Sequence, residues 1–218
     1  MTIMKKWARL VAFGDSITRG YAVPDGAGWV ELLSGLLPAV RVVNAGGNGN
    51  TSAEGLQRFE TEVLPHLPGL VLVEFGGNDA GHDARAVSVD AFERNLLAIA
   101  DQVRSNGGEI VLLTFPPIIN AWHTARSDPY YAPWGGLDPC VDAYRQRTRE
   151  VAQRLGCPLF DLDEFLRKLI AGEKPETFIQ PDGVHLTPEA NRQIAAAVLQ
   201  FIENLSRSTW NYPKQPRD

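Results

Sequence analysis

The stretch "RLVAFGDSITRG" (residues 9–20) joins a short apolar run to a glycine, an acid and a serine. The run "RLVAF" (9–13) has the length and the apolar character of a buried strand. Directly after it the chain must turn, and it does so with Asp15 and Ser16. An acid followed by a serine is also an ordinary way to cap a helix. Whether Ser16 is a catalytic residue therefore depends on which side chains the rest of the chain places beside it.

Four further apolar runs of strand length follow, each rich in β-branched or aromatic residues. We expect strands at 9–13, 40–45, 70–75, 109–115 and 158–162. Runs that are almost continuously apolar are typical of parallel strands buried on both faces. The intervening segments have helical spacing, at 28–37, 52–67, 88–107, 138–156 and 187–207, and Ser88 and Asp138 are the expected N-caps of two of them. The alternation predicts a doubly wound, three-layer α/β fold.

Composition and charge narrow the class of protein. The chain has 218 residues, of which 44% are hydrophobic and 22% are charged, a balance close to that of soluble globular domains. We predict one domain over residues 1–207, followed by a polar, proline-containing tail at 208–218. The net charge is −5 with mixed signs along the sequence, so no basic stripe indicates nucleic acid and no polybasic patch indicates a membrane surface.

The two cysteines, Cys140 and Cys157, are too few for a disulfide framework and do not form a CxxC pair. The beginning of the chain lacks the long apolar region of a signal peptide, and no segment reaches the ~18 apolar residues of a spanning helix. A cytoplasmic location and no stable membrane insertion are the expectations. Asp79, His82 and Asp83 lie on one short loop, but ligands so close in sequence rarely complete a coordination sphere, so we expect neither metal nor cofactor.

Polar and glycine-rich segments follow the predicted strands. They read "GDS" (14–16), "GGNGNTS" (46–52), "GGNDAGHD" (76–83) and "QPDGVHLTPE" (180–189). Ligands of open parallel sheets bind beyond the carboxyl ends of the strands, so these segments are expected to share one edge. Each has a purely structural explanation as a cap or a tight turn. Those explanations do not account for a hydroxyl, amide groups and an acid–histidine pair occurring together.

A serine becomes a good nucleophile when a histidine, oriented by a carboxylate, takes its proton. Four histidines are candidates for that base. His66 ends a predicted helix, where a surface or capping role is more common, and His82 and His123 lie in loops that could contact a ligand. His185 differs because Asp182 precedes it by three residues on a predicted turn. That spacing brings both side chains to one side of the turn and leaves Nε2 free to face a serine.

In their order along the chain, these segments resemble the four blocks of the SGNH hydrolases, the GDSL family of esterases and lipases. "FGDSITRG" (13–20), "NAGGNGNTS" (44–52), "GGND" (76–79) and "DGVH" (182–185) are similar to the blocks, which span residues 13 to 187. The resemblance implies a flavodoxin-like, five-stranded parallel sheet and ester hydrolysis without a cofactor. Two departures are Asn50, where the family often has aspartate, and "GDSI" in place of "GDSL", an apolar exchange of similar volume.

The resemblance also implies roles for individual residues. Ser16 is expected to be the nucleophile, His185 the general base and Asp182 the acid that orients it. The oxyanion would be held by the N–H groups of Ser16 and Gly49 and by the side-chain amide of Asn78, since preset donors stabilise the charge that develops during acyl transfer. Asp15 is a further candidate for contact with substrate.

The segment 116–137 is long for a connection without secondary structure, and such loops are often functional. Its candidates for substrate binding are Trp122, His123, Tyr130, Tyr131 and Trp134. Aromatic side chains can line a pocket for an acyl chain or a sugar, or they can simply pin the loop to the core, and both explanations remain open. The predicted activity is that of a serine esterase acting on short acyl or O-acetyl esters. The alternative is a flavodoxin-like module that binds phosphate or flavin without hydrolase activity.

Overall fold

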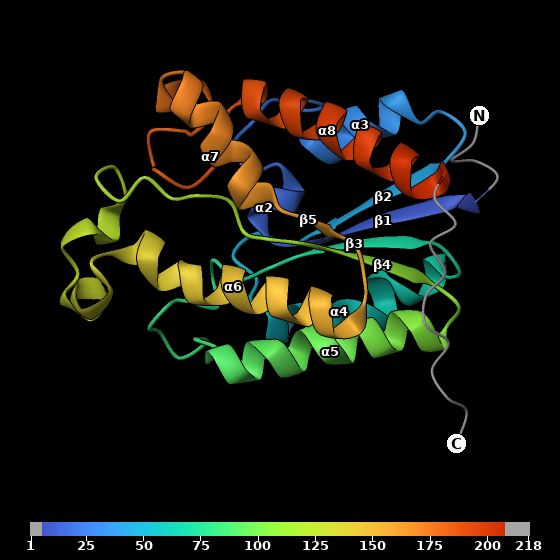
Figure 1. Ribbon diagram of the computed structural model, residues 1–218, viewed down its shortest axis with the longest axis horizontal. Helices are drawn as coiled ribbons and strands as arrows, with labels where there is room; N and C mark the ends of the chain where they lie inside the picture. Colours follow the sequence, from blue (N-terminus) through green and yellow to red (C-terminus); the bar gives the residue numbers. More distant parts are fainter. Residues whose placement is uncertain (1–5, 208–218) are drawn as a thin grey trace.

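Figure 1 shows the computed structural model, which describes residues 6–207; the predicted tail at 208–218 lies outside this range. The strands are β1 (Arg9–Gly14), β2 (Arg41–Gly46), β3 (Leu70–Glu74), β4 (Glu109–Leu113) and β5 (Leu159–Phe160). They form one parallel sheet in the order β2-β1-β3-β4-β5. The predicted five-stranded, flavodoxin-like sheet is confirmed. Strand order reverses between β1 and β3, so their carboxyl ends flank the place where such sheets bind ligands.

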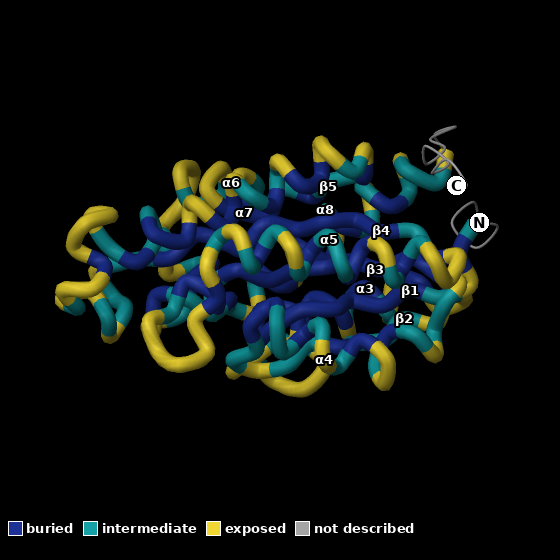
Figure 2. Tube along the Cα trace, turned by 90° about the horizontal axis from the view of Figure 1, so that it is seen from below, coloured by how far each residue is buried: buried dark blue, intermediate teal, exposed yellow. Residues whose placement is uncertain are grey.

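Helices cover both faces of this sheet (Figure 1). One face carries α3 (Trp29–Leu36), α7 (Leu162–Gly172) and α8 (Pro188–Arg207), and the other carries α4 (Ser52–Glu62), α5 (Val89–Ser105) and α6 (Leu137–Leu155). Short 3-10 helices are η1 (Leu64–His66), η2 (Thr124–Ser127), η3 (Pro129–Trp134) and η4 (Pro175–Thr177). The buried apolar side chains form one cluster between these layers. Figure 2 shows the central strands β1, β3 and β4 largely buried, with exposed residues along the outer helices.

Burial differs between the central and the edge strands. All of β3 is buried, as continuous hydrophobicity predicts. The expectation of burial on both faces is wrong for β2, where Val42 and Val43 are only partly covered, because β2 is an edge strand with a neighbour on one side only. At the opposite edge, β5 pairs with β4 through only two residues, Leu159 and Phe160, although the apolar run is longer.

The ends of the helices largely follow the local sequence. Ser88 caps α5 as predicted, accepting a hydrogen bond from the N–H of Ala91. The predicted cap at Asp138 is wrong, because α6 begins at Leu137 and Asp138 lies in its first turn. There the Asp138 carboxylate accepts the N–H of Ile118 at 2.7 Å instead of capping its own helix. This contact fastens the start of the long loop to α6.

Arg145 anchors the same loop from within the core. Its side chain is completely buried and donates to the carbonyl oxygens of Phe115 and Pro116, at 3.0 and 2.6 Å. Its charge is balanced by Asp138, at 2.6 Å, and by Asp163, at 3.4 Å. A buried arginine with this many partners is costly to disturb, because removing one member leaves another charge unpaired. The loop that follows β4 therefore starts from a rigid base.

Candidate active site

Ser16 is the first residue of α2 (Ser16–Arg19), a single turn of helix directly after β1. Asp15 is the N-cap, and its Oδ1 accepts the N–H of Ile17 at 2.9 Å. Gly20 ends the turn in a left-handed conformation. The N–H of Ser16, as the first of the helix, has no carbonyl four residues earlier within the helix to bond. The local sequence thus presents one hydroxyl and one free N–H at the end of the strand.

Gly14 allows α2 to lie this close to the sheet. A Cβ at this position would be 2.2 Å from Thr18 Oγ1 and 2.6 Å from the carbonyl oxygen of Glu74. Any larger residue would push α2 away from β3, since both contacts are below van der Waals distance. The glycine before the acid and the serine is therefore needed for close approach.

Asp182 and His185 lie on a turn before α8, as predicted. Oδ1 of Asp182 accepts the N–H groups of Val184 and His185, each at 2.9 Å, and Oδ2 lies 2.6 Å from His185 Nδ1. Gly183 has a φ of +79°, which favours glycine, and packs against the loop after β4. Burial opposes ionisation of Asp182, but these hydrogen bonds together lower its pKa below the ordinary value.

The second ring nitrogen of His185 faces Ser16. His185 Nε2 lies 3.0 Å from Ser16 Oγ, although the two residues are 169 positions apart. Asp182, His185 and Ser16 thus form one hydrogen-bonded series. Tyr21 packs beside it, with its ring centroid 4.4 Å from that of the imidazole. Only 8% of Ser16 is exposed, so the residue is largely shielded from solvent.

Asn78, from the loop after β3, is tied to the same place. Its Nδ2 donates to Oδ2 of Asp15 at 3.0 Å and to the carbonyl oxygen of Asn50 at 3.1 Å. The amide is therefore fixed against both the turn that carries Ser16 and the loop that follows β2. Gly49, the neighbour of Asn50, has a φ of +72°. Within residues 6–207 no group accepts a hydrogen bond from the Gly49 N–H.

Two buried acids lie beside the site: Glu74 was not identified from the sequence, and Asp79 was considered there only as a possible metal ligand. Glu74, the last residue of β3, is 1% exposed, and Asp79 is fully buried. Asp79 accepts the N–H and the hydroxyl of Ser52, the first residue of α4. Burial raises the pKa of Asp79 to about 6 despite these hydrogen bonds. The residue "E" within the apolar run "LVLVEF" (70–75) was the available signal, because an acid inside a buried strand requires a partner.

Asp15, a predicted substrate contact, is completely buried and serves as the cap of α2. The aromatic residues of the loop divide into two groups. Trp122 and His123 pack beside Gly183, next to the Asp182–His185 turn.

Tyr130, Tyr131 and Trp134 pack together on η3. The ring of His82 stacks on Tyr130 with a centroid distance of 4.8 Å, and Tyr131 is buried. Tyr131 thus helps to pin the loop to the core, whereas Tyr130 and Trp134 remain exposed. No contact within the described range joins these three rings to Ser16 or His185.

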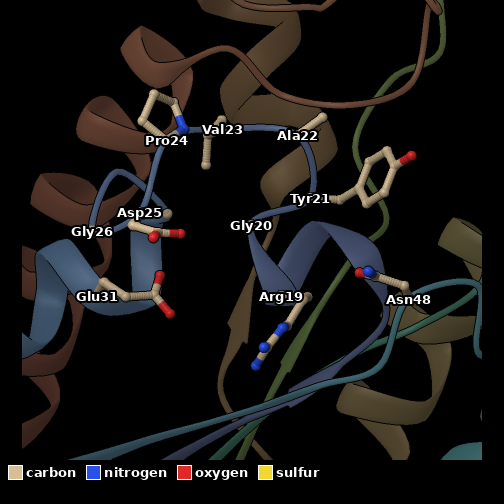
Figure 3. A pocket seen from close by; sticks show the side chains of 11 residues that line it. Arg19, Gly20, Tyr21, Ala22, Val23, Pro24, Asp25, Gly26, Glu31 and Asn48 are labelled. Carbon is tan, nitrogen blue, oxygen red and sulfur yellow. The ribbon is translucent and has the colours of Figure 1, made fainter.

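A hollow of about 310 Å³ opens beside Tyr21 (Figure 3). Its lining is mainly polar and includes Arg19, Asp25, Glu31 and Asn48. Figure 3 shows the carboxylates of Asp25 and Glu31 on one side, with Arg19 and Asn48 across from them. A second hollow, of about 320 Å³ and mainly apolar, is lined by Trp122, Glu176, Ile179, Pro181 and Thr187, of which Pro181 directly precedes the Asp182–His185 turn. One polar hollow and one apolar hollow thus lie near the site.

Over residues 6–207 no group of three or more histidine, cysteine, aspartate or glutamate side chains is arranged to hold a metal ion. In the same range no helix combines the length and the apolar character that crossing a bilayer requires.

Known proteins share both the sequence pattern and the fold. A model of the GDSL-like Lipase/Acylhydrolase family matches residues 12–193. The uncharacterized lipoprotein YqeF of Bacillus subtilis is 30% identical over 205 residues, covering 84% of each chain. An arylesterase of Vibrio mimicus is 29% identical over 200 residues, covering 89% of this chain and 88% of its own.

Among solved structures, the lipase/acylhydrolase from Enterococcus faecalis is 28% identical, with a TM-score of 0.73 over 90% of this chain and 96% of that one. The likeness therefore extends over almost the whole described fold and includes the four segments at the edge of the sheet. These matches favour ester hydrolysis over the flavin-binding alternative. The chain belongs to the GDSL-like lipase/acylhydrolase family and is a carboxylic ester hydrolase.

Proposed function

We propose that the protein hydrolyses short acyl or O-acetyl esters through an acyl-enzyme on Ser16, with His185 as general base and Asp182 as its orienting acid. The observation that carries this proposal is the hydrogen-bonded series of the three side chains, with 3.0 Å between Ser16 Oγ and His185 Nε2 and 2.6 Å between His185 Nδ1 and Asp182. These distances are within the range expected for a nucleophile and its base.

In the proposed reaction, Ser16 Oγ attacks the ester carbonyl carbon while its proton passes to Nε2 of His185. The imidazolium that forms is stabilised by the carboxylate of Asp182, whose lowered pKa keeps it ionised. His185 then gives the proton to the departing alkoxide, and the alcohol leaves. Water, deprotonated by the same imidazole, attacks the acyl-enzyme and releases the carboxylic acid and Ser16.

Three donors are proposed for the oxyanion of the tetrahedral intermediate. The N–H groups of Ser16 and Gly49 have no acceptor in the described structure that competes with a substrate oxygen. Both N–H groups of the Asn78 amide donate in the absence of substrate, to Asp15 and to the carbonyl oxygen of Asn50, so Asn78 donates to the oxyanion by exchanging its contact with Asn50. Donors that are fixed in advance, here the two backbone N–H groups, stabilise developing charge without reorganisation, and each contributes ~10²–10³ in rate.

The two hollows suggest which portion of the ester substrate each of them binds. The polar hollow near Arg19 and Glu31 suits an alcohol portion that carries hydroxyl groups, and the apolar one near Trp122 suits a short acyl chain. A panel of acetyl, butyryl and octanoyl p-nitrophenyl esters, together with an acetylated sugar, tests this assignment. We expect turnover of the acetyl and sugar esters to exceed that of octanoyl ester. The cytoplasmic location remains a prediction from the sequence.

The nucleophile is tested with Ser16→Ala and with the matched control Ser105→Ala, which changes an exposed serine of α5. We expect the first to abolish hydrolysis of p-nitrophenyl acetate and the second to leave it unchanged. A reactive organophosphate should add to the wild type and the control, as measured by intact mass, but not to Ser16→Ala. A folded Ser16→Ala protein with wild-type turnover rejects the nucleophile assignment.

A further inference from the structure

Two carboxyl groups lie together beneath the Ser16 turn, isolated from solvent. Asp15 follows β1 directly, and Glu74 ends β3; the strands pair with Gly14 opposite Glu74. The side chains are 0% and 1% exposed. When two adjacent carboxyl groups are both buried away from solvent, ionising both carries a large free-energy penalty. We therefore expect the pair to retain one proton at neutral pH.

The hydrogen bonds of Asp15 indicate that it is the ionised member. Its Oδ1 accepts the N–H of Ile17 at 2.9 Å, and its Oδ2 accepts Nδ2 of Asn78 at 3.0 Å. Both donors are N–H groups that cannot act as acceptors. A carboxylate satisfies them through both oxygens, whereas a protonated Asp15 would place an O–H close to one of them.

The surroundings of Glu74 indicate that it carries the proton. Its Oε2 accepts the hydroxyl of Thr18 at 2.9 Å, while its Oε1 is buried without a hydrogen-bonding partner in the described structure. An ionised Glu74 would leave a charged oxygen unsatisfied in the core. A protonated Glu74 is a donor, and the acceptor beside it is Asp15. Burial and the charge of Asp15 both raise the pKa of Glu74 well above its ordinary value.

We propose that Glu74 is a positioning residue that stays protonated and donates its carboxylic-acid proton to the Asp15 carboxylate, which in turn fixes the Asn78 amide and the helical turn that carries Ser16. Through Thr18, Glu74 also binds the underside of the same turn. One buried acid thus holds two parts of the site, the nucleophile and an oxyanion donor. The inference rests on the proposed function for the roles of Ser16 and Asn78, but the protonation of Glu74 does not depend on it.

Other charged groups near the pair do not remove the need for this proton. Asp79 adds a further negative charge near Asp15 and so disfavours ionisation of the pair. The guanidinium of Arg58 donates to the carbonyl oxygen of Gly14 and to Glu62, and within residues 6–207 no hydrogen bond joins it to either carboxyl. The negative charge on Asp15 is therefore stabilised by the N–H groups of Ile17 and Asn78 and, in this proposal, by the Glu74 acid.

Infrared difference spectroscopy tests directly whether Glu74 carries a proton. The measurement is made at about pH 8, where ordinary carboxyl groups are ionised. We expect the wild type to show the C=O stretch of a protonated carboxylic acid, which disappears in Glu74→Gln and persists in the exposed control Asp83→Asn. Absence of the band in the folded wild type, or its survival in Glu74→Gln, overturns the proposal. This measurement requires no esterase activity, so it separates failure of the inference from failure of the proposed function.

Kinetics on an acetyl ester test the positioning role. Glu74→Gln keeps both the shape and an N–H donor toward Asp15, so its kcat should stay within about threefold of the wild type. Glu74→Met keeps the shape but not the donor, and its kcat should fall by about tenfold or more with KM changed by less than about twofold, because the oxyanion donor acts in the transition state. Equal kcat values for the two variants contradict the positioning role. If Glu74→Met does not fold, the infrared band still decides the proposal.

Discussion

The buried acid Asp79 should make the stability of this protein depend on pH in an unusual direction. Its carboxylate holds the first residue of α4, Ser52, next to the Asn78 loop, and burial raises its pKa from 3.8 to about 6. The folded protein therefore binds a proton at Asp79 more tightly than the unfolded chain does. The stabilisation by this proton is fully present below the unfolded pKa of 3.8 and is lost as pH rises through about 6.

The size of the effect follows from the two pKa values. A difference of about two pKa units corresponds to about 3 kcal/mol of unfolding free energy between low and high pH. Between about pH 7.5 and about pH 5, roughly half of this is expected, or about 1–2 kcal/mol. The wild type should gain this amount relative to Asp79→Asn as the pH is lowered, because the variant has no proton to bind at that position.

Urea unfolding of both proteins at several pH values measures this difference. The comparison cancels the titrating groups that the two proteins share, apart from Asp15, whose pKa is raised to about 7 by burial and further by the charge of Asp79. The matched control is Asp83→Asn, since Asp83 is exposed and Arg85 lowers its pKa, first through hydrogen bonds, out of the range used. Its unfolding free energy should run parallel to that of the wild type between about pH 7.5 and pH 5. A constant difference between wild type and Asp79→Asn over this range, or one of opposite sign, refutes the argument.

Three further predictions follow from the contacts. Asn78→Ala should lower kcat on an acetyl ester by ~10²–10³ with little change in KM, and an unchanged kcat would exclude Asn78 from the oxyanion site. Arg145→Met should lower the unfolding free energy in urea by about 3–5 kcal/mol, because Asp138 loses its buried partner; a loss below about 1 kcal/mol would contradict this. Gly14→Ala should cost about 1–3 kcal/mol and also reduce kcat, since the added Cβ collides with Thr18 and displaces the Ser16 turn. Wild-type stability and kcat in that variant would disprove the close-approach argument.

The parts of the fold that were predicted well depend on neighbours in the sequence. Apolar runs such as "LVLV" (70–73) identify strands because most residues of a strand that is buried on both faces are apolar. The capping serine at 88 and the Asp182–His185 turn likewise use partners only a few residues away. The sequence-based predictions are wrong where exposure or pairing depends on the position of a strand in the sheet. The half-exposure of β2 and the short pairing of β5 follow from lying at the edges.

The site shows the same division. The sequence suggested which groups belong together, but the 3.0 Å contact between Ser16 and His185 joins residues 169 positions apart and exists only in the folded chain. The complete burial of Asp15 also depends on atoms from other elements.

The alternation of strands and helices, the order of the four polar segments and the local turn that pairs an acid with a histidine can all be predicted from the amino-acid sequence. Which strands lie at the edges, how the aromatic loop is anchored on Arg145 and what surrounds Glu74 depend on the packing of distant elements. The two groups of features differ because hydrophobic patterning and capping act over a few residues, whereas desolvation and proton affinity depend on every atom that packs around a group.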